Sequence, residues 1–464
     1  MLYPPKIIGK VCKKISLQAI PAWVAATAGC LRQQGFRTYL VGGAVRDLLT
    51  GKIPQDWDLA TDALPDQVEV IFPETIPTGK KYGIISIVIE GHCLETATLR
   101  EDLTYSDGRR PDAIRFTREI TADLARRDFT INALACNLEN GALIDPFDGV
   151  RDLNQGILKA VGNPAQRFQE DGLRMFRFYR FLATLNLQPD RATNRAVNPR
   201  WAAPVSKERI GAELAKLLVG NNVVKGLDGL QTSGLLGLSL PELDRKQLEA
   251  GDSREKQLWR HLTGTVAAIR PQLHLRWAAL LHDIAKPLTK TYGSKGLHYN
   301  GHAETGAEVS RVVLERLHYS KALINSVVSL VQQHMFAVPF PYSDAAIRRL
   351  IARTGTENIL DLLELRRADI VATGRITTDT WEYWRVLSER VNSVLNADTT
   401  VFRPDQLALN GNDLITKFQL SPGPLIGRIL RFLLEQVWDD PNLNRPDTLL
   451  ELARRYLDGL ETDI

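Results

Sequence analysis

The sequence predicts an α+β protein, in which a mixed α/β head is followed by all-α domains. Short β-rich runs alternate with helical segments up to about residue 150. Beyond that residue, apolar side chains recur with a helical period, and turn sequences such as Gly162-Asn-Pro164 separate the segments. The 464 residues also exceed what one hydrophobic core holds, so we expect about three or four domains.

The head is expected to contain both strands and helices. Branched and aromatic residues mark four candidate strands: Arg37–Val41, Gly83–Glu90, Cys93–Leu99 and Ala113–Phe116. Two further segments carry a helical pattern: Val45–Thr50 and Phe129–Leu138. These elements make up the mixed α/β part of the predicted fold.

Composition excludes several classes of protein. Charged residues make up 24% and hydrophobic residues 44%, which is typical of a soluble globular chain. No apolar run is long enough to span a membrane. The cysteines lack the spacing of a zinc site or of a disulfide framework: Cys12, Cys30, Cys93 and Cys136. We therefore expect a cytoplasmic protein without a membrane partner.

The net charge of +4 is unevenly distributed. Between Ala165 and Leu218 the sequence has ten Lys and Arg residues against five Asp and Glu residues. A locally basic surface suits a polyanionic partner such as RNA. On this count alone, a solvated helix face is an equally good interpretation.

The segment Tyr39–Asp47 reads as a strand that enters a Gly42-Gly43 turn and then a helix. Glycine lets the backbone come close to a phosphate, and a helix N-terminus favours anions. Arg46, in the first turn of that helix, can bind a triphosphate through two N–H groups of its guanidinium. We therefore predict that Gly43 and Arg46 bind a nucleotide, although tight turns often use a Gly-Gly pair for other reasons.

Asp56 and Asp58 follow at the expected start of a strand, where alternation places both carboxylates on one face. Such a pair can hold two Mg²⁺ ions, which activate a 3′-hydroxyl and neutralise a leaving pyrophosphate. An isolated Asp-x-Asp is usually a solvated pair, but the preceding Gly-Gly turn favours the metal site. Glu95 is our first choice for a third carboxylate and Asp102 the second, and either residue also fits as a surface acid.

Five further segments follow in order: Tyr105–Pro111, Ala125–Leu134, Glu170–Arg180, Glu208–Leu214 and Leu420–Gly427. They resemble the flexible loop, head-closing motif, base-selecting helix, neck motif and tail of the tRNA nucleotidyltransferases. This family comprises the bacterial-type CCA-adding enzymes and poly(A) polymerases of the polymerase-β superfamily. The resemblance implies a polymerase-β-like head followed by an all-α neck, body and tail. It also implies that Arg127 touches the nucleotide. For Asp128 we expect a simple ion pair with Arg127.

The resemblance implies base selection by Asp171 and Arg174, which are three residues apart and so are expected on one helix face. Cytosine and adenine each present an amine beside a ring nitrogen. Asp171 can accept from the amine while Arg174 donates to the nitrogen. Guanine and uracil present the reverse pattern and leave buried groups unpaired, at about 1–3 kcal/mol each. Arg177 and Arg180 continue the stripe and can hold phosphates. A salt-bridged helix surface is the alternative, and the three-residue period of arginines next to an aspartate disfavours it.

The second half of the chain contains His and Asp residues in the order that resembles an HD domain, whose ligands hold a divalent metal between helices. The four basic positions are His261, His282, Asp283 and Asp369, and His302 and His334 extend the set. Buried, hydrogen-bonded histidines of a decayed domain are the alternative interpretation. A metal-bound HD domain would add a second activity, the hydrolysis of phosphate esters at RNA ends.

These segments divide the chain into four predicted domains. The head spans residues 1–148, the neck 149–250, the HD domain 251–375, and a tail expected to bind tRNA 376–464. The main hypothesis is templateless addition of CMP and AMP from CTP and ATP to the 3′ end of tRNA. A poly(A) polymerase, an HD-type phosphohydrolase and an RNA-binding scaffold are the alternatives. The product stays open between full CCA and a terminal A. CC alone is disfavoured, because the segment Arg100–Pro111 looks complete and the resemblance implies a shortened loop in CC-only enzymes.

Overall fold

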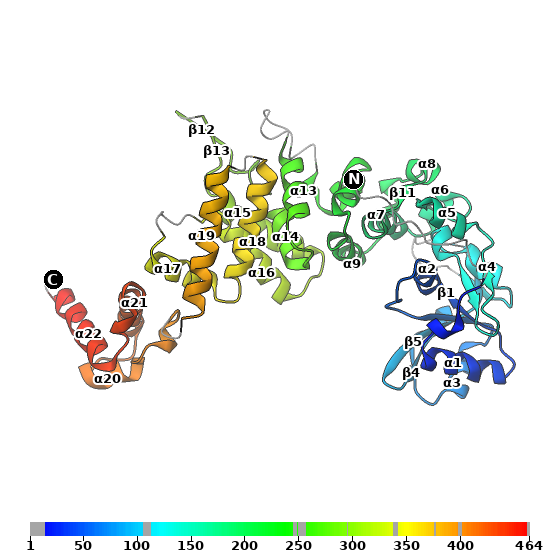
Figure 1. Cartoon of the computed structure of the whole chain (residues 1–464), viewed down its shortest axis with the longest axis horizontal. Coiled ribbons are helices and arrows are strands. Elements are labelled where there is room, and N and C mark those ends of the chain that lie inside the picture. The colour runs from blue at the N-terminus through cyan, green and yellow to red at the C-terminus, as the bar shows by residue number, and fades with distance from the viewer. Residues whose placement is uncertain are drawn as a thin grey trace. The chain divides into compact units, whose positions relative to one another are not determined.

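The computed structural model describes residues 14–104, 113–244, 248, 257–294, 296–336, 342–374, 377–397 and 401–461. The chain divides into two compact units, Met1–Arg245 and Lys246–Ile464 (Figure 1). The first unit begins with a mixed α/β head and the second is mainly helical, which confirms the α+β fold class. The finer division into four domains stays a prediction, and the loop motif Tyr105–Pro111 lies outside the described residues. In the described part of the chain, no helix combines the length and apolar character needed to cross a membrane.

A seven-stranded sheet forms the centre of the head, in the order β3-β4-β5-β2-β1-β8-β9. Its strands are β1 Thr38–Val41, β2 Asp58–Thr61, β3 Thr75–Gly79, β4 Ile84–Ile89, β5 His92–Thr98, β8 Ala135–Asn137 and β9 Leu143–Ile144. β2 and β5 run parallel, and the other neighbouring pairs are antiparallel. A separate hairpin joins β6 (Arg100–Thr104) to β7 (Ala113–Phe116). The predicted strands are confirmed as β1, β4, β5 and β7, with ends that differ by at most one residue.

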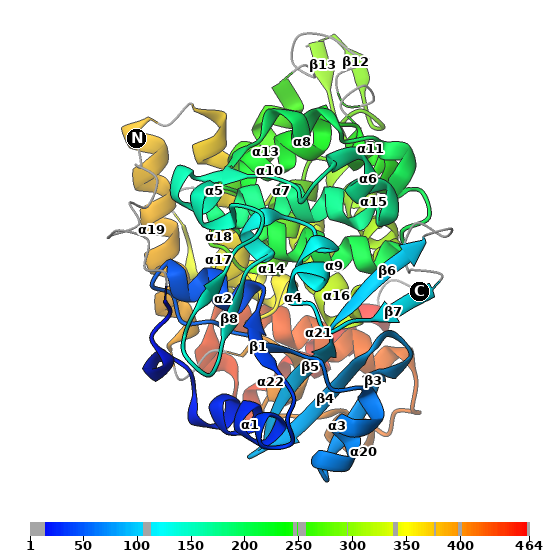
Figure 2. The ribbon, with the colours of Figure 1, turned by 90° about the vertical axis from the view of Figure 1, so that its right-hand side faces the viewer.

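Helices cover both faces of this sheet. They are α1 Ala22–Gln33, α2 Gly43–Leu49, α3 Pro65–Ile71 and α4 Ile120–Ala125, of which α2 confirms a predicted helix. Leu40 and Leu59 point to the face covered by α1, and α3 lies beside α1 (Figure 2). Ala60 points to the opposite face and packs with residues of α4. Because side chains alternate along a strand, Asp58 shares the α4 face with Ala60.

The predicted helix Phe129–Leu138 is wrong. A single turn of 3-10 helix, Thr130–Asn132, is followed by β8, which pairs with β1. Leu134 and Cys136 enter the core on the α1 side, whereas the alanines that alternate with them enter the core on the α4 side. Alternation between two cores favours a strand, and this packing overrides the local helix propensity.

Helices dominate the rest of the first unit. They are α5 Gly149–Gln155, α6 Pro164–Glu170, α7 Leu173–Leu185, α8 Arg191–Arg195, α9 Lys207–Leu218, α10 Val223–Thr232 and α11 Leu235–Ser239. Two short strands, β10 Ile157–Leu158 and β11 Gln188–Pro189, pair in parallel beside them. α7 is central, because it packs against both α9 and α10 and buries Phe176, Phe178 and Leu182. Its arginines are thereby held in fixed positions.

The described residues of the second unit form helices and a short hairpin. The helices are α13 Leu258–Ala268, α14 Leu273–Leu281, α15 His302–Arg316, α16 Lys321–Gln333, α17 Asp344–Thr354, α18 Ile359–Thr373, α19 Thr378–Leu395, α20 Gly411–Phe418, α21 Pro424–Asp439 and α22 Pro446–Glu461. The strands of the hairpin are β12 Thr291–Gly293 and β13 Gly296–His298. The last three helices share a core of their own that includes Leu414, Leu433 and Leu449. Arg349 of α17 pairs with Asp439 at 2.6 Å, which ties α21 to α17.

Candidate functional site

Three carboxylates lie near one another where β2 begins. Asp58 is the first residue of β2, and Glu95 of β5 is its neighbour in the parallel register. Asp56 lies in a bend, not in the strand that we expected, because the pairing between β1 and β2 ends at Val41 and Asp58. Burial raises the pKa of Asp58 to about 6, aided by the negative charges of Glu95 and Asp56 and opposed by Arg127. A raised pKa of this kind is typical of a buried carboxyl group among other acids.

Removing the charge of Asp58 should therefore stabilise the metal-free protein. The pKa of Asp58 is higher in the folded chain than in the unfolded chain. Its ionisation therefore destabilises the folded state at every pH above the pKa of the unfolded group. We expect Asp58→Asn to increase the free energy of unfolding by about 1–2 kcal/mol at pH 8, after a discount for partial exposure. The gain should shrink as the pH falls from 6 towards 4, because the folded wild type is then protonated.

Urea denaturation in a chelator, at pH 8 and at pH 5, measures this difference. A matched Asp66→Asn variant, at a carboxylate whose side chain is 84% exposed, should gain nothing. Equal stability of wild type and Asp58→Asn at pH 8 would mean that the carboxylates do not repel one another in the folded chain.

Asp102, the second candidate for a third carboxylate, has other partners. It lies in β6, and its carboxylate pairs with Arg100 Nε at 3.0 Å. Arg126 Nη1 lies 3.9 Å from its other oxygen. The geometry therefore brings Glu95 beside Asp58 and gives Asp102 a structural ion pair.

The Gly42-Gly43 turn has the expected form. α2 begins at Gly43, and Gly42 before it has a φ of +71°, which glycine adopts without strain. A Cβ on Gly42 would lie 2.8 Å from Arg127 Nη1, so glycine also leaves room for this guanidinium. The turn thus holds Arg127 against the backbone, where its charge acts on Asp58.

Hydrogen bonds connect Arg46 to the neck. Arg46 Nη1 donates to Asn132 Oδ1 at 2.7 Å, and Asn132 Nδ2 donates to Asp128 Oδ1 at 3.1 Å. Asp128 Oδ2 then pairs with Arg177 Nη2 at 2.7 Å. The expected pairing of Asp128 with Arg127 is therefore wrong, because α7 of the neck supplies the partner from the other side.

A buried carboxylate that we did not predict, Asp123 of α4, orients Arg127. Asp123 Oδ2 pairs with Arg127 Nη2 at 3.3 Å, and Asp123 Oδ1 pairs with Arg126 Nη2 at 2.7 Å. Burial acts to raise the pKa of Asp123, but the two arginines outweigh it and lower the pKa. The signal in the sequence is the helical spacing, since Asp123 precedes the arginines by three and four residues.

Asp171 and Arg174 do not share a helix face, contrary to our expectation. α6 ends at Glu170, Asp171 is extended with a φ of −147°, and α7 begins only at Leu173. The Asp171 side chain accepts the backbone N–H of Leu173 at 3.0 Å. The break occurs because this carboxylate satisfies a free N–H at the start of the new helix.

Each of these two residues has a different charged partner. Asp171 Oδ2 pairs with Arg209 Nη2 at 2.8 Å. Arg174 Nη1 donates to Glu170 Oε2 at 2.7 Å, and its Nη2 donates to the Arg126 carbonyl at 2.9 Å. A carboxylate oxygen accepts more than one hydrogen bond and a guanidinium has five N–H groups, so both side chains keep capacity for a base edge.

Arg177 and Arg180 are held in an ion-pair network. Arg180 Nε pairs with Glu213 Oε2 at 2.7 Å, and Arg177 Nη1 lies 3.6 Å from Glu213 Oε1. The Arg180 guanidinium also lies 3.8 Å from the centre of the Phe181 ring. Burial lowers the pKa of Arg180 to about 10 despite the charge of Glu213. Because Glu213 already pairs with both arginines, their role at phosphates stays a prediction.

Gly172 is a position where a side chain should disturb base selection. A Cβ there would lie 2.1 Å from the backbone oxygen of Trp201, which has no flexible end that can move aside. We expect Gly172→Ala to displace Asp171 and to lower the free energy of unfolding by about 1–3 kcal/mol. Denaturation and CMP incorporation measure both effects.

The control for this variant is Gly29→Ala. Gly29 lies in α1 with open space around it, so alanine there should be neutral or slightly stabilising. A Gly172→Ala protein as stable and as active as wild type would show that α7 can shift at no cost.

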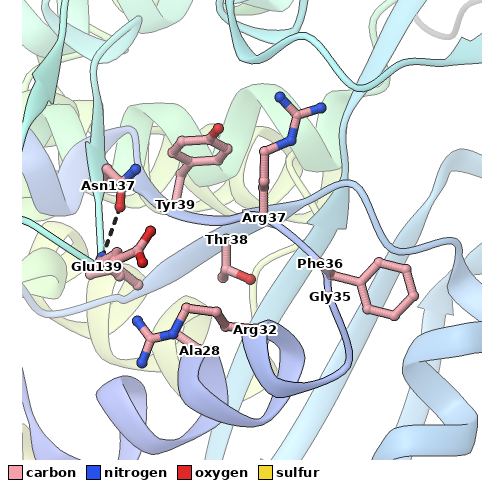
Figure 3. A pocket seen from close by; sticks show the side chains of 10 residues that line it. Ala28, Arg32, Gly35, Phe36, Arg37, Thr38, Tyr39, Asn137 and Glu139 are labelled. Atoms are coloured by element: carbon pink, nitrogen blue, oxygen red, sulfur yellow. Dashed lines mark hydrogen bonds between the residues drawn. The ribbon is translucent and has the colours of Figure 1, made fainter.

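A small cavity lies at the other end of β1. It has a volume of about 160 Å³, and its lining includes Arg32 of α1, Thr38 of β1 and Glu139 (Figure 3). β1 runs from Thr38 towards Gly42, so the cavity is separated from the carboxylates by the length of the strand. It is not part of the candidate nucleotide site.

Comparisons with known proteins agree with this arrangement. Residues 38–159 match the family model described as poly A polymerase head domain, residues 203–247 the RNA and SrmB-binding site of polymerase A, and residues 302–453 the tRNA nucleotidyltransferase domain 2. The CCA-adding enzyme of Lactiplantibacillus plantarum is 34% identical over 428 residues, which cover 92% of this chain and 94% of that protein. This chain belongs to the CCA-adding enzyme family. Members of this family are tRNA nucleotidyltransferases, enzymes that generally use divalent metal ions.

Solved structures of CCA-adding enzymes share the fold. The Bacillus stearothermophilus CCA-adding enzyme in complex with CTP has a TM-score of 0.73 at 27% identity, covering 95% of this chain and 98% of that one. The Thermotoga maritima CCA-adding enzyme complexed with tRNA has a TM-score of 0.56 at 19% identity, covering 97% of this chain and 100% of that one. At that lower identity the likeness concerns the fold alone.

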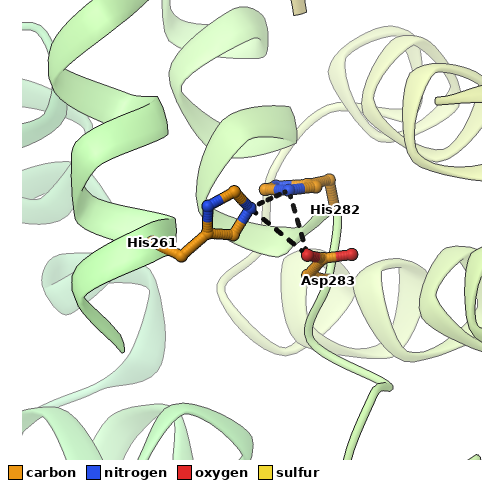
Figure 4. A group of neighbouring side chains, drawn as sticks. All are labelled: His261, His282 and Asp283. Carbon is orange, nitrogen blue, oxygen red and sulfur yellow. Dashed lines mark hydrogen bonds and ion pairs between the residues drawn. The ribbon is translucent and has the colours of Figure 1, made fainter. Parts of the chain in front are cut away.

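In this member of the CCA-adding enzyme family, the second unit brings together all six predicted histidine and aspartate residues. They come from α13 (His261), the end of α14 (His282 and Asp283), the start of α15 (His302), the end of α16 (His334) and α18 (Asp369). Figure 4 shows the rings of His261 and His282 directed at each other and at Asp283. Their convergence is a property of the fold, whereas metal binding by them stays a prediction.

The cluster favours positive charge. His261 Nε2 lies 3.4 Å from Asp283 Oδ2 and 3.2 Å from Asp369 Oδ1. Burial acts to lower the pKa of His261, but the two carboxylates outweigh it and raise the pKa to about 9. A divalent cation would supply the positive charge that these carboxylates attract.

Proposed function

We propose that the head transfers CMP and AMP from CTP and ATP to the 3′ end of tRNA, in the cytoplasm, at the site formed by three carboxylates. The observation that carries this assignment is the position of Asp58 opposite Glu95 on the neighbouring strand. The charges of Asp56 and Arg127 also act on Asp58. The relatives are named CCA-adding enzymes and one of them is solved with CTP, which supports these substrates.

Asp56, Asp58 and Glu95 would hold two Mg²⁺ ions. Their oxygens are the ligands that Mg²⁺ prefers, and a divalent cation would offset the negative charges of Glu95 and Asp56, which help to raise the pKa of Asp58. When bound, such ions activate the tRNA 3′-hydroxyl and neutralise the leaving pyrophosphate. The strands position the ligands, because adjacent β2 and β5 hold Asp58 and Glu95 at a fixed separation.

Arg46 and Arg127 would bind the triphosphate above Gly42 and Gly43. The Arg127 guanidinium lies directly over Gly42, and Asp123 fixes its orientation. Arg46 is held by Asn132 at the other side of the turn. Two oriented guanidinium groups beside a backbone without side chains suit a polyphosphate.

Asp171 and Arg174 would read the base. Asp171 would accept from the amine of cytosine or adenine, and Arg174 would donate to the ring nitrogen beside it. The ion pair with Arg209 supports this assignment, because a carboxylate only accepts hydrogen bonds and cannot donate to the oxygen of uracil or guanine. Templateless choice of C and A then follows from two protein side chains.

Product lengths with single nucleotides test this function. A tRNA that ends before its CCA sequence is incubated with CTP, with ATP or with both, and the products are resolved on a gel. A CCA-adding enzyme extends it with CTP alone and further with both nucleotides. An A-adding enzyme extends only tRNA that already ends in CC, and a poly(A) polymerase adds long tails to unrelated RNA. No incorporation under any condition would refute the proposal.

A second function is favoured by the cluster in the second unit. The convergence of His261, His282, Asp283 and Asp369 supports binding of a divalent metal and hydrolysis of phosphate esters at RNA ends. Metal analysis of the wild-type chain and of His282→Ala tests it. A wild-type chain without metal affinity in this unit would contradict the assignment.

A further inference from the structure

Asn132 connects the two arginines of the proposed triphosphate site. Its side-chain Oδ1 accepts a hydrogen bond from Arg46 Nη1 at 2.7 Å, and its backbone oxygen accepts one from Arg127 Nη1 at 3.5 Å. Asn132 is only 6% exposed, so little water competes for these contacts. Both arginines therefore depend on this residue for part of their orientation.

The other end of the Asn132 amide faces a carboxylate. Nδ2 donates to Asp128 Oδ1 at 3.1 Å, and Asp128 Oδ2 pairs with Arg177 Nη2 of α7 at 2.7 Å. Burial acts to raise the pKa of Asp128, but Arg177 and Asn132 outweigh it and lower the pKa to about 2, so the carboxylate accepts from both. A flipped amide would turn its oxygen to the carboxylate and its N–H groups to Arg46, so only one orientation fits.

Phe181 of α7 provides a second contact to Arg46. The Arg46 guanidinium lies 5.5 Å from the centre of the Phe181 ring, and the Arg177 guanidinium lies 5.4 Å from the same centre. A guanidinium within about 6 Å of an aromatic ring is attracted to it. The ring packs edge to face against the fully buried Phe129, at 5.7 Å between centres, which fixes its plane. Arg46 is thus linked to α7 by hydrogen bonds through Asn132 and by a shared ring.

The turn that carries Asn132 is held firmly by its neighbours. It is the 3-10 turn Thr130–Asn132, and Thr130 Oγ1 donates to the buried carboxyl group of Asp152 in α5 at 2.7 Å. A Cβ on Gly149 of α5 would lie 2.1 Å from the Thr130 backbone oxygen, so α5 packs on the turn with no room for a side chain. Because this backbone is fixed, the Asn132 amide holds the groups at its two ends at a fixed separation.

We propose that Asn132 is a positioning residue that links triphosphate binding at Arg46 to base selection on α7. This inference rests on the proposed roles of Arg46 at the triphosphate and of Arg174 at the base. Arg177 lies one helical turn beyond Arg174, so its ion pair with Asp128 helps to fix the part of α7 that reads the base. A phosphate that draws Arg46 into place therefore also sets α7, and a correctly bound triphosphate makes the choice of base more stringent.

A double-mutant cycle on base selection tests this link. Incorporation of CMP and of UMP into tRNA that lacks its CCA end gives the ratio of kcat/KM for CTP over UTP. Arg46→Lys keeps the charge but loses the planar guanidinium, and we expect it to lower this ratio about tenfold. Asn132→Leu should lower the ratio by a similar factor and raise KM for CTP about tenfold, because Arg46 and Asp128 each lose a hydrogen bond. The double variant should fall no further than either single variant, because each breaks the same link.

Asn132→Asp separates the two ends of the amide. Its carboxylate still accepts from Arg46, but it has no N–H for Asp128 and repels that carboxylate. We therefore expect KM for CTP to stay within about threefold of wild type, while the ratio of CTP over UTP falls as in Asn132→Leu. A residue that only stabilised the fold would leave both KM and the ratio of the folded protein unchanged.

Asn137→Leu is the matched control. Asn137 lies in β8 opposite Tyr39, and its Oδ1 accepts the backbone N–H of Glu139 at 2.8 Å. This variant also loses an asparagine hydrogen bond in the head, but it should keep the wild-type KM and ratio. Circular dichroism and urea denaturation establish that each variant is folded, and Asn132→Asp carries the test and the cycle if the leucine variant is not.

The outcomes separate this link from the proposed function itself. A wild-type ratio in folded Asn132→Leu or Asn132→Asp protein would overturn the inference. Effects of Arg46→Lys and Asn132→Leu that multiply in the double variant would also overturn it, because the two residues would then act independently. No incorporation by the wild-type chain would instead refute the proposed nucleotidyl transfer.

Discussion

The Asp58→Asn variant should lose nucleotide incorporation, with kcat lowered by about 10³–10⁴-fold, which corresponds to about 4–6 kcal/mol of transition-state stabilisation. Asp58 is the register neighbour of Glu95, and burial together with the charges of Glu95 and Asp56 raises its pKa. A neutral amide binds a divalent cation far more weakly than a carboxylate does. Primer extension of a tRNA that lacks its CCA end, under single-turnover conditions, measures the loss.

The same variant carries its own control for folding. Without metal it should be more stable than wild type, so a loss of activity together with a gain in stability cannot come from unfolding. Asp66→Asn, at an exposed carboxylate of α3, should retain the wild-type rate. Full incorporation by Asp58→Asn would mean that catalysis takes place elsewhere in the chain.

Glu95 and Asp102 can be separated in the same assay. Glu95→Gln should lower kcat by about a hundredfold or more, because Glu95 is the register neighbour of Asp58. Asp102→Asn should have less than about a tenfold effect on kcat and act mainly on stability, since its carboxylate pairs with Arg100. The opposite order would identify Asp102 as the third metal ligand.

The strands of the head could be predicted because their signals are local. Branched and aromatic residues mark β1, β4 and β5, and glycines mark the turn before α2. The segment Phe129–Leu138 could not be read in this way. Its alanines and leucines suit a helix locally, and it becomes a strand only because β1 offers an open edge and two cores need its side chains.

The carboxylate pair could be predicted, but the partners of the arginines could not. Asp56 and Asp58 are near each other in any conformation, because only one residue separates them. Asp128 forms an ion pair with Arg177 and not with its sequence neighbour Arg127. Asp171 pairs with Arg209, which lies 38 residues further along the sequence. Such choices depend on how helices pack, and a single sequence has no short-range signal for them.

The histidine cluster was predictable in membership and not in arrangement. Its residues stand in an order that resembles an HD domain, and the structure brings them together. The order does not say which histidines face which oxygen of Asp283. That division follows from the backbone carbonyls at the ends of α14 and α16, which set the ring orientations of His282 and His334.

Replacing Asp171 by asparagine should relax the choice of base. An asparagine presents an amide N–H as well as an oxygen, so it can donate to the carbonyl oxygen of uracil or guanine, which the carboxylate cannot. We expect the ratio of kcat/KM for CTP over UTP to fall by about 10–100-fold, as for the loss of one hydrogen bond to a charged group. Incorporation of each of the four nucleotides into the same tRNA, measured singly, gives the ratio.

Two further variants decide whether this effect belongs to base reading. Asp190→Asn changes another helix-capping aspartate of the neck and should leave the ratio unchanged, because asparagine caps equally well. Arg209→Gln removes the partner of Asp171 and should lower the ratio by less than Asp171→Asn does, since the carboxylate remains and only its orientation is lost. If Asp171→Asn lowered the rates with all four nucleotides equally, Asp171 would be a cap for α7 and not a reader of bases. A selective gain of UTP, by contrast, would require that its carboxylate meets the base edge during the reaction.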